Sequence, residues 1–327
     1  MKRSCSQLNT HLHRRKSELE SYRPEPTLDG AALDRFWSAE LARHAERPLG
    51  IVRERAESPF AAVAIDRLTY FGFDDTPIHG WFLVPQSRAA GERLPCIVTY
   101  PGYTGDRGLP ERYAHWLLLG FAVLAVDARG QGGETGSRLR FDAGAAKGWV
   151  SLGIADKASS YYMALTVDAM RAVEAAAQQV EADPDRLAVV GASQGGGLSL
   201  LAAALHPGVA AVVADIPNMC HMDFGLLNST GSLTELAQYV SRYPDRLDIV
   251  LDSLAHFDLL NLAHRITAPV LMSVGWKDTV CLPETVYAAY NRIGSPKRIV
   301  DYPFIGHEVK EDQVREAIVF LRETLLR

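Results

Sequence analysis

The sequence has few of the features that mark several large classes of protein. Its four cysteines, Cys5, Cys96, Cys220 and Cys281, form no CxxC pair and no cluster with histidine at the spacing of metal ligands. We interpret them as free thiols of a reducing compartment and predict no metal site. No apolar run reaches the roughly 18 residues of a transmembrane helix. No apolar stretch follows the basic N-terminus, as a secretory signal requires, and we therefore predict a cytoplasmic protein.

An excess of charge of one sign is also missing. The 327 residues include 34 Lys and Arg against 39 Asp and Glu, a formal net charge of −5. This balance does not favour nucleic acid or an anionic membrane as a partner. Hydrophobic residues make up 47% of the chain, which has 26 glycines and 17 prolines. These values exclude the collagen-like, disordered and coiled-coil classes, and the chain has no internal repeat.

Apolar segments alternate with helical ones over most of the chain. Strands that are apolar on both faces and separated by helices indicate an α/β protein with a mostly parallel central sheet and helices on both faces. Strands are expected within 96–103, 121–130, 186–193, 210–217, 268–275 and 298–303, and helices within 111–120, 157–180, 195–206 and 311–327.

The rest of the chain departs from this alternation. Residues 1–20 are polar and basic and are expected to form a loosely ordered tail, which leaves 21–327 as a single domain. Residues 34–44 have helical spacing, and 61–84 are typical of two paired strands with a DDTP turn. The polar, mostly helical segment 218–264 interrupts the alternation, and we interpret it as an insertion over the C-terminal edge of the sheet.

A motif for a serine nucleophile lies where one strand meets a helix. Residues 191–195, Gly-Ala-Ser-Gln-Gly, fit the G-x-S-x-G pattern, follow the apolar strand LAVV and open a helix rich in glycine and alanine. This is the context of a nucleophile elbow in the α/β-hydrolase fold, where small neighbours accommodate a strained serine. The motif predicts Ser193 as nucleophile. The alternative is a glycine-rich turn with an incidental serine.

In this fold the acid and then the histidine follow the serine along the chain. His307 lies in a short loop after strand RIVDYP and before the last helix, which predicts it as the base. Asp278 ends the preceding strand, 85 residues after Ser193 and 29 before His307, and is predicted as the acid. Its rivals, Asp252 and Asp258, lie in the insertion. Alternatively, His307 is a surface residue and Asp278 a helix N-cap.

Two backbone amides are needed to stabilise the oxyanion that forms on the substrate. One should come from Gln194, the residue after the nucleophile, and the other from the PGYTG turn after strand CIVTY, with Tyr103 as the candidate donor. A purely structural turn is the alternative for Tyr103.

Three motifs together resemble those of a known family. Arg129-Gly130-Gln131, the elbow and His307-Glu308 are similar to the motifs of carbohydrate esterase family 7, the acetyl xylan esterases and cephalosporin C deacetylases. Further segments match as well, among them YRPEP, GYTGDRG and SQGGGLSL, so that the resemblance covers the chain from about residue 18 to its end.

The resemblance implies an α/β-hydrolase core, no cofactor, and removal of acetyl groups from small and varied acetyl esters. It implies the roles already predicted for the serine, acid, base and oxyanion donors. It further implies that Arg129 and Gln131 brace the site, that Pro217 and Val280 wall a short acyl pocket, and that six chains form a hexamer around an internal cavity. The alternative for Arg129 is an ordinary pair with Asp127 or Glu134.

The sequence departs from the family after the strand that follows the elbow helix. Residues 216–220 read IPNMC in place of a Pro-Phe-Leu-Cys-like segment, and the insertion after them is unusual. The insertion carries five apolar residues close together, which favours a subunit interface, with a lid over its own active site as the alternative. The five apolar residues are Met219, Met222, Phe224, Leu226 and Leu227.

Two other functions stay open: hydrolysis of another ester, thioester or peptide bond, and non-catalytic binding.

Overall fold

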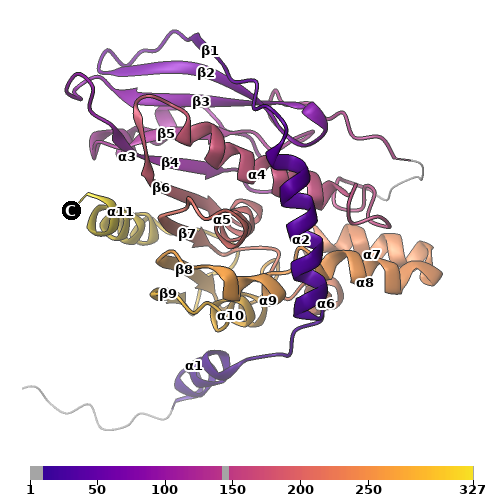
Figure 1. The fold of residues 1–327 in the computed structure, drawn as a ribbon. Coiled ribbons are helices and arrows are strands. Elements are labelled where there is room, and N and C mark those ends of the chain that lie inside the picture. Colours follow the sequence, from indigo (N-terminus) through magenta and orange to yellow (C-terminus); the bar gives the residue numbers. More distant parts are fainter. Residues whose placement is uncertain (1–9, 142–146, 327) are drawn as a thin grey trace, which may run out of the picture.

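A single nine-stranded sheet runs through the computed structural model, which describes residues 10–141 and 147–326 (Figure 1). The strands are arranged in the order β1-β2-β3-β5-β4-β6-β7-β8-β9. Their bounds are β1 (Val52–Arg55), β2 (Val63–Phe71), β3 (Pro77–Pro85), β4 (Leu94–Tyr100), β5 (Ala122–Val126), β6 (Ala182–Ala192), β7 (Ala211–Asp215), β8 (Val270–Gly275) and β9 (Lys297–Tyr302).

Eleven α-helices and four short 3₁₀ helices accompany the sheet in the described part of the chain. The α-helices are α1 (His11–Ser21), α2 (Gly30–Ala45), α3 (Ala114–Leu118), α4 (Tyr161–Ala177), α5 (Gln194–Leu205), α6 (Met222–Asn228), α7 (Leu233–Arg242), α8 (Leu247–Ala255), α9 (Leu259–Leu262), α10 (Pro283–Tyr290) and α11 (Glu311–Leu325). The 3₁₀ helices are η1 (Phe73–Asp75), η2 (Pro110–Tyr113), η3 (Pro244–Arg246) and η4 (Ala263–Arg265). None of these helices is long and apolar enough to cross a membrane.

The sheet has an antiparallel and a parallel part. Strands β1 to β3 pair antiparallel, and β3 pairs antiparallel with β5. All pairs from β5 to β9 are parallel, so their C-terminal ends lie at one edge of the sheet. The predicted strand pair in 61–84 is β2 and β3. Strand β1 was not predicted, because the sequence Val-Arg-Glu-Arg of this mostly exposed edge strand carries no apolar signal.

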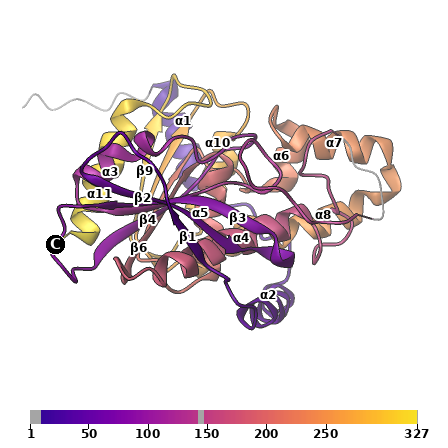
Figure 2. The same ribbon diagram turned by 90° about the horizontal axis from the view of Figure 1, so that it is seen from above.

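Alternate residues of the central strands face two separate cores. In β5, Ala122, Leu124 and Val126 pack in one cluster, and Val123 and Ala125 pack in the other. Residues of α2, α4, α5 and α10 complete the first cluster, and residues of α3 and α11 complete the second. Figure 2 shows these helices around the sheet, seen from above. Helices cover both faces of the sheet, so side chains on both faces of the central strands are buried. This explains why these strands are apolar along their whole length.

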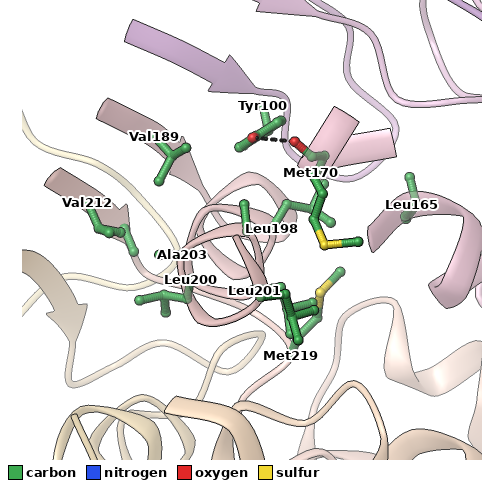
Figure 3. Close-up of a cluster of buried hydrophobic side chains, with 14 of the residues drawn as sticks. Tyr100, Leu165, Met170, Val189, Leu198, Leu200, Leu201, Ala203, Val212 and Met219 are labelled. Carbon is green, nitrogen blue, oxygen red and sulfur yellow. Dashed lines mark hydrogen bonds between the residues drawn. The ribbon is translucent and has the colours of Figure 1, made fainter. Parts of the chain in front are cut away.

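Helix α5 is the central helix of the first core. Figure 3 shows Leu198, Leu200 and Leu201 of this helix among side chains of α4 and of the sheet. Tyr100 at the end of β4 donates a hydrogen bond of 2.8 Å from its hydroxyl to the carbonyl of Ala169 in α4. This bond ties α4 to the sheet beside the helix that begins at the predicted elbow.

The N-terminal residues differ from our prediction of a loosely ordered tail over 1–20. Residues 11–21 form α1, and Thr10 caps it by accepting from the N–H of His13. Leu19 is only 1% exposed, and Lys16 lies 2.6 Å from Asp301 of β9. The prediction is thus wrong for residues 11–20, because contacts with distant parts of the chain order a polar segment. Residues 1–9, including Cys5, lie outside the described residues.

The predicted insertion consists of the helical segments α6 to η4, which follow β7 and precede β8 along the chain (Figure 1). Its five clustered apolar residues do not form one exposed patch. Met219 and Met222 are 3% and 0% exposed in the single chain, whereas Leu227 is 85% exposed. The cluster therefore supports a subunit interface less than the sequence indicated.

Candidate active site

Ser193 occupies a strained turn between β6 and α5. Its φ of 57° and ψ of −119° lie in a region that residues with a side chain rarely adopt. The turn is possible because the residues two positions before and after Ser193 are glycines. A Cβ on Gly191 would lie 2.3 Å from the carbonyl carbon of Gly195, and one on Gly195 would lie 2.2 Å from the carbonyl oxygen of Tyr100. The local structure is thus the predicted elbow.

The structure brings Ser193, His307 and Asp278 into one chain of hydrogen bonds. His307 Nε2 lies 2.9 Å from Ser193 Oγ, and His307 Nδ1 lies 2.7 Å from Asp278 Oδ2. Asp278 is 2% exposed and follows β8, whereas His307 follows β9 and keeps 27% of its side chain exposed. A proton on Nδ1 satisfies the carboxylate and leaves Nε2 free to accept from the serine.

The backbone fixes the orientation of the Asp278 carboxylate. Its Oδ1 accepts from the N–H groups of Val280 and Cys281 at 2.8 and 2.9 Å, which leaves Oδ2 for His307. Cys281 is a buried free thiol, as are Cys96 and Cys220. Burial raises the pKa of the Cys281 thiol well above its usual value. Sequence reasoning gave Cys281 no place in the site.

The rival acids are engaged elsewhere. Asp252 lies 2.7 Å from the ammonium group of Lys157. Asp258 is buried, and its carboxylate accepts from the N–H groups of His221 and Leu260 at 2.7 and 2.8 Å. Neither has a hydrogen bond to His307 among the described residues.

Gln131 connects the two segments that carry the predicted oxyanion donors. Its Oε1 accepts from the N–H of Thr104, next to Tyr103, at 2.7 Å, and its Nε2 donates to Gln194 Oε1 at 2.9 Å. Gln194 is the first residue of α5, so its backbone N–H has no acceptor within the helix and lies at the positive end of the helix dipole. The loop after β4 and the start of α5 are therefore held in fixed relation.

Arg129 is completely buried and pairs with α4. Its Nε and Nη2 donate to the two carboxylate oxygens of Asp168 at 2.6 and 2.7 Å, and its Nη1 lies 3.1 Å from Asp74. Burial lowers the pKa of Arg129, but the charge of Asp168 and its hydrogen bonds more than reverse this effect and raise the pKa above its usual value. The side chain thus remains cationic inside the protein.

The alternative partners considered for Arg129 are wrong. Asp127 and Glu134 both bind Arg107, which lies 2.6 Å from Glu134 Oε2 and also contacts Asp127. Sequence reasoning missed Asp168. The only signal for it was an acidic residue near the middle of a largely apolar, alanine-rich helix, which also carries Arg171 and Glu174.

Pro217 and Val280 lie next to the elbow and to the acid. Pro217 is buried, and a Cβ on Gly196 of α5 would lie 3.2 Å from its Cα. Val280 is half-buried, and its carbonyl accepts from Ser229 Oγ of the insertion at 2.7 Å. The insertion thus contacts a residue beside the predicted acid. Within 10–141 and 147–326, no group of three or more His, Cys, Asp and Glu could hold a metal ion.

Comparisons with known proteins identify the family and the fold. A family model described as acetyl xylan esterase (AXE1) matches residues 13–325. The solved structure of an acetyl xylan esterase from Paenibacillus sp. R4 is 36% identical, with a TM-score of 0.91 over 94% of this chain and 99% of that chain. Acetyl xylan esterase 1 from Thermoanaerobacterium sp. JW/SL YS485 is 29% identical, with a TM-score of 0.87 over 94% and 98%.

A curated relative, acetyl esterase Axe7A from Xylanibacter ruminicola, is 27% identical over 84% of this chain. The chain spans 62% of the length of that relative. These comparisons confirm the predicted α/β-hydrolase fold and the resemblance to the acetyl xylan esterases.

Proposed function

The chain belongs to the acetyl xylan esterase family and is a carboxylic ester hydrolase, and on this premise we propose that it removes acetyl groups from small acetylated substrates. Acetylated xylo-oligosaccharides and cephalosporin C are the proposed examples. The observation that supports this proposal most strongly is the hydrogen-bond chain of Ser193, His307 and Asp278 at the sheet edge where β6, β8 and β9 end.

In the proposed reaction, Ser193 Oγ attacks the acetyl carbonyl while His307 Nε2 accepts its proton. The imidazolium then protonates the alcohol, which leaves, and the acetyl group stays on the serine. Water attacks the acyl-enzyme with His307 again as base, and acetate departs. Asp278 holds the Nδ1 proton and stabilises the imidazolium, and no cofactor takes part.

The proposed oxyanion donors are the backbone N–H groups of Tyr103 and Gln194. Negative charge on the carbonyl oxygen grows as the tetrahedral intermediate forms, so fixed donors bind the transition state more tightly than the substrate. Arg129 and Gln131 support this site without touching the reacting atoms. Gln131 does so through its bonds to the donor loops, and Arg129 through its pair with α4.

The acyl pocket is proposed to be short, with Pro217 and Val280 as its walls. Two positions support this proposal: Pro217 packs against the first turn of α5, and Val280 follows the proposed acid by two residues. We further propose a hexamer whose sites face an internal cavity, on the family resemblance alone. The cytoplasmic location stays a prediction from sequence.

The function is tested with 4-nitrophenyl esters of increasing acyl length, assayed beside acetylated xylose and cephalosporin C. Hydrolysis of acetyl esters by the wild type, abolished in Ser193→Ala with an unchanged circular dichroism spectrum, is the expected result. A Ser199→Ala variant in the same helix is the matched control, because its hydroxyl only bonds the Gly195 carbonyl. Absence of hydrolysis by the wild type, or full activity of Ser193→Ala, would contradict the proposal. Hydrolysis of peptides or thioesters in preference to acetyl esters would favour the other hydrolase function.

A further inference from the structure

The side chain of Tyr103 is held from several directions, although only its backbone is needed for the chemistry proposed above. Its hydroxyl donates to Glu235 Oε2 at 2.7 Å and accepts from the backbone N–H of Trp149 at 3.1 Å. The indole of Trp149 meets the phenol ring edge-on, with centroids 5.5 Å apart. Burial raises the pKa of Tyr103 well above its usual value, so the hydroxyl keeps its proton and remains a donor.

Glu235 reaches Tyr103 from the insertion, 132 residues further along the chain. It lies in the first turn of α7, where a carboxylate interacts favourably with the helix dipole. Leu233 and Leu236 on either side of it are 4% and 0% exposed. The carboxylate is therefore carried by a helix that is itself packed into the protein.

The backbone opposite Glu235 is shaped to receive the carboxylate. Gly148 has a φ of +83°, and a Cβ at this position would lie 2.1 Å from both carboxylate oxygens. A side chain here would displace Glu235, and the adjacent Trp149 supplies the N–H to the Tyr103 hydroxyl. The phenol, the carboxylate and this backbone thus form one closely packed contact.

We propose that Glu235 is a positioning residue, which fixes the backbone N–H of Tyr103 for the oxyanion by holding the tyrosine side chain. The inference rests on the proposed function, because it assumes that this N–H binds the oxyanion. Gln131 holds the following residue, Thr104, from the body of the domain. Glu235 holds the side chain of Tyr103 from the insertion, and so couples the insertion to catalysis.

A double-mutant cycle with Glu235→Ala and Tyr103→Phe tests the proposal. Removing a whole oxyanion donor costs about 10²–10³-fold in kcat, and a displaced donor should cost less, about 10-fold or more. We expect this loss in each single variant with little change in KM, and a double variant no slower than the worse single one. Glu235→Gln should recover most activity, because its amide oxygen can still accept from the phenol. Gln238→Ala, an exposed position of α7, is the control.

A second measurement separates positioning from loss of structure. A trifluoromethyl ketone forms a tetrahedral adduct with the serine and carries the oxyanion, so its Ki should weaken by the same factor as kcat/KM in each variant. An unchanged Ki, an additive double variant or wild-type kcat in Glu235→Ala would overturn the proposal. If Glu235→Ala does not fold, Tyr103→Phe with wild-type kcat and Ki has the same consequence. Activity that survives Ser193→Ala instead contradicts the proposed function.

Discussion

Replacing Asp278 by asparagine tests the proposed acid through the hydrogen bonds around its side chain. Val280 and Cys281 both donate to Oδ1, and His307 Nδ1 lies 2.7 Å from Oδ2. In Asp278→Asn the amide oxygen should take the place of Oδ1, because an NH₂ group there would face two backbone donors. The NH₂ then faces His307, so Nδ1 must accept and Nε2 must carry the proton. In that tautomer His307 cannot take the proton of Ser193.

The size of the effect follows from the cost of rotating the asparagine into the other orientation. Rotation would leave two buried N–H groups unpaired, at about 1–3 kcal/mol each. A total cost of about 2–6 kcal/mol confines the active tautomer, with its proton on Nδ1, to a small fraction of molecules. At about 1.36 kcal/mol per tenfold, this fraction corresponds to a loss in kcat of roughly 30-fold to 10⁴-fold. The missing negative charge adds to this loss, so we expect kcat near the upper end, about 10⁴-fold below wild type.

The assay is steady-state hydrolysis of 4-nitrophenyl acetate, with thermal unfolding recorded to show that the variant is folded. Asp252→Asn is the matched control, since this aspartate lies beside Lys157 at the surface and was a rival for the acid. It should retain wild-type kcat. A folded Asp278→Asn enzyme within about tenfold of wild type would refute the assignment, and a large loss in Asp252→Asn would point to the rival.

Four further results are expected. Arg129→Met leaves Asp168 buried without its cation and should destabilise the protein by about 3–5 kcal/mol in urea unfolding; an unchanged midpoint would contradict this. Acetyl esters should be hydrolysed faster than butyryl esters by about 10–200-fold per methylene if Pro217 and Val280 close the pocket, and equal rates for octanoate would remove the deacetylase function. Light scattering should give about 215 kDa for six chains of 35.9 kDa, whereas a stable monomer would rule out the hexamer. Burial, and then nearby arginines, lower the pKa of His44 to about 4. The unfolded chain therefore takes up this proton first, and stability should fall from pH 6.5 to pH 4 less steeply in His44→Leu than in wild type.

The parts of the site that lie at strand ends could be predicted from sequence. Apolar strands show where the sheet must be, and parallel strands place their C-terminal ends at one edge. Ser193, Asp278 and His307 each follow such a strand, so a pattern local in sequence fixed their common location. The structure brings these three side chains within hydrogen-bond distance of one another.

Contacts made over long distances in the chain could not be predicted. Helix α1 has no strong apolar pattern, and it is held by bonds such as that from Asn291 to the carbonyl of Leu19, 272 residues away. The pair of Tyr103 and Glu235 likewise has no local signal. Arg129 was predicted to brace the site, with a pair to a neighbour such as Asp127 as the alternative, but the carboxylate of Asp127 accepts from the N–H groups of Glu134 and Thr135. Only the tertiary structure decides between such partners.

The buried ion pair between Arg129 and Asp168 joins the loop after β5 to α4. A buried ion pair adds little stability compared with apolar packing. We therefore infer that this pair serves to fix the position of the loop. Asp168 fixes Arg129, whose carbonyl accepts from the hydroxyl of Tyr161 at 2.5 Å, and the same hydroxyl accepts from Gln131. The loop after β5 is thereby fastened to α4 at both ends of the Arg-Gly-Gln motif. Because Gln131 in turn bonds to Thr104 and Gln194, this buried helix contributes to positioning both proposed donors.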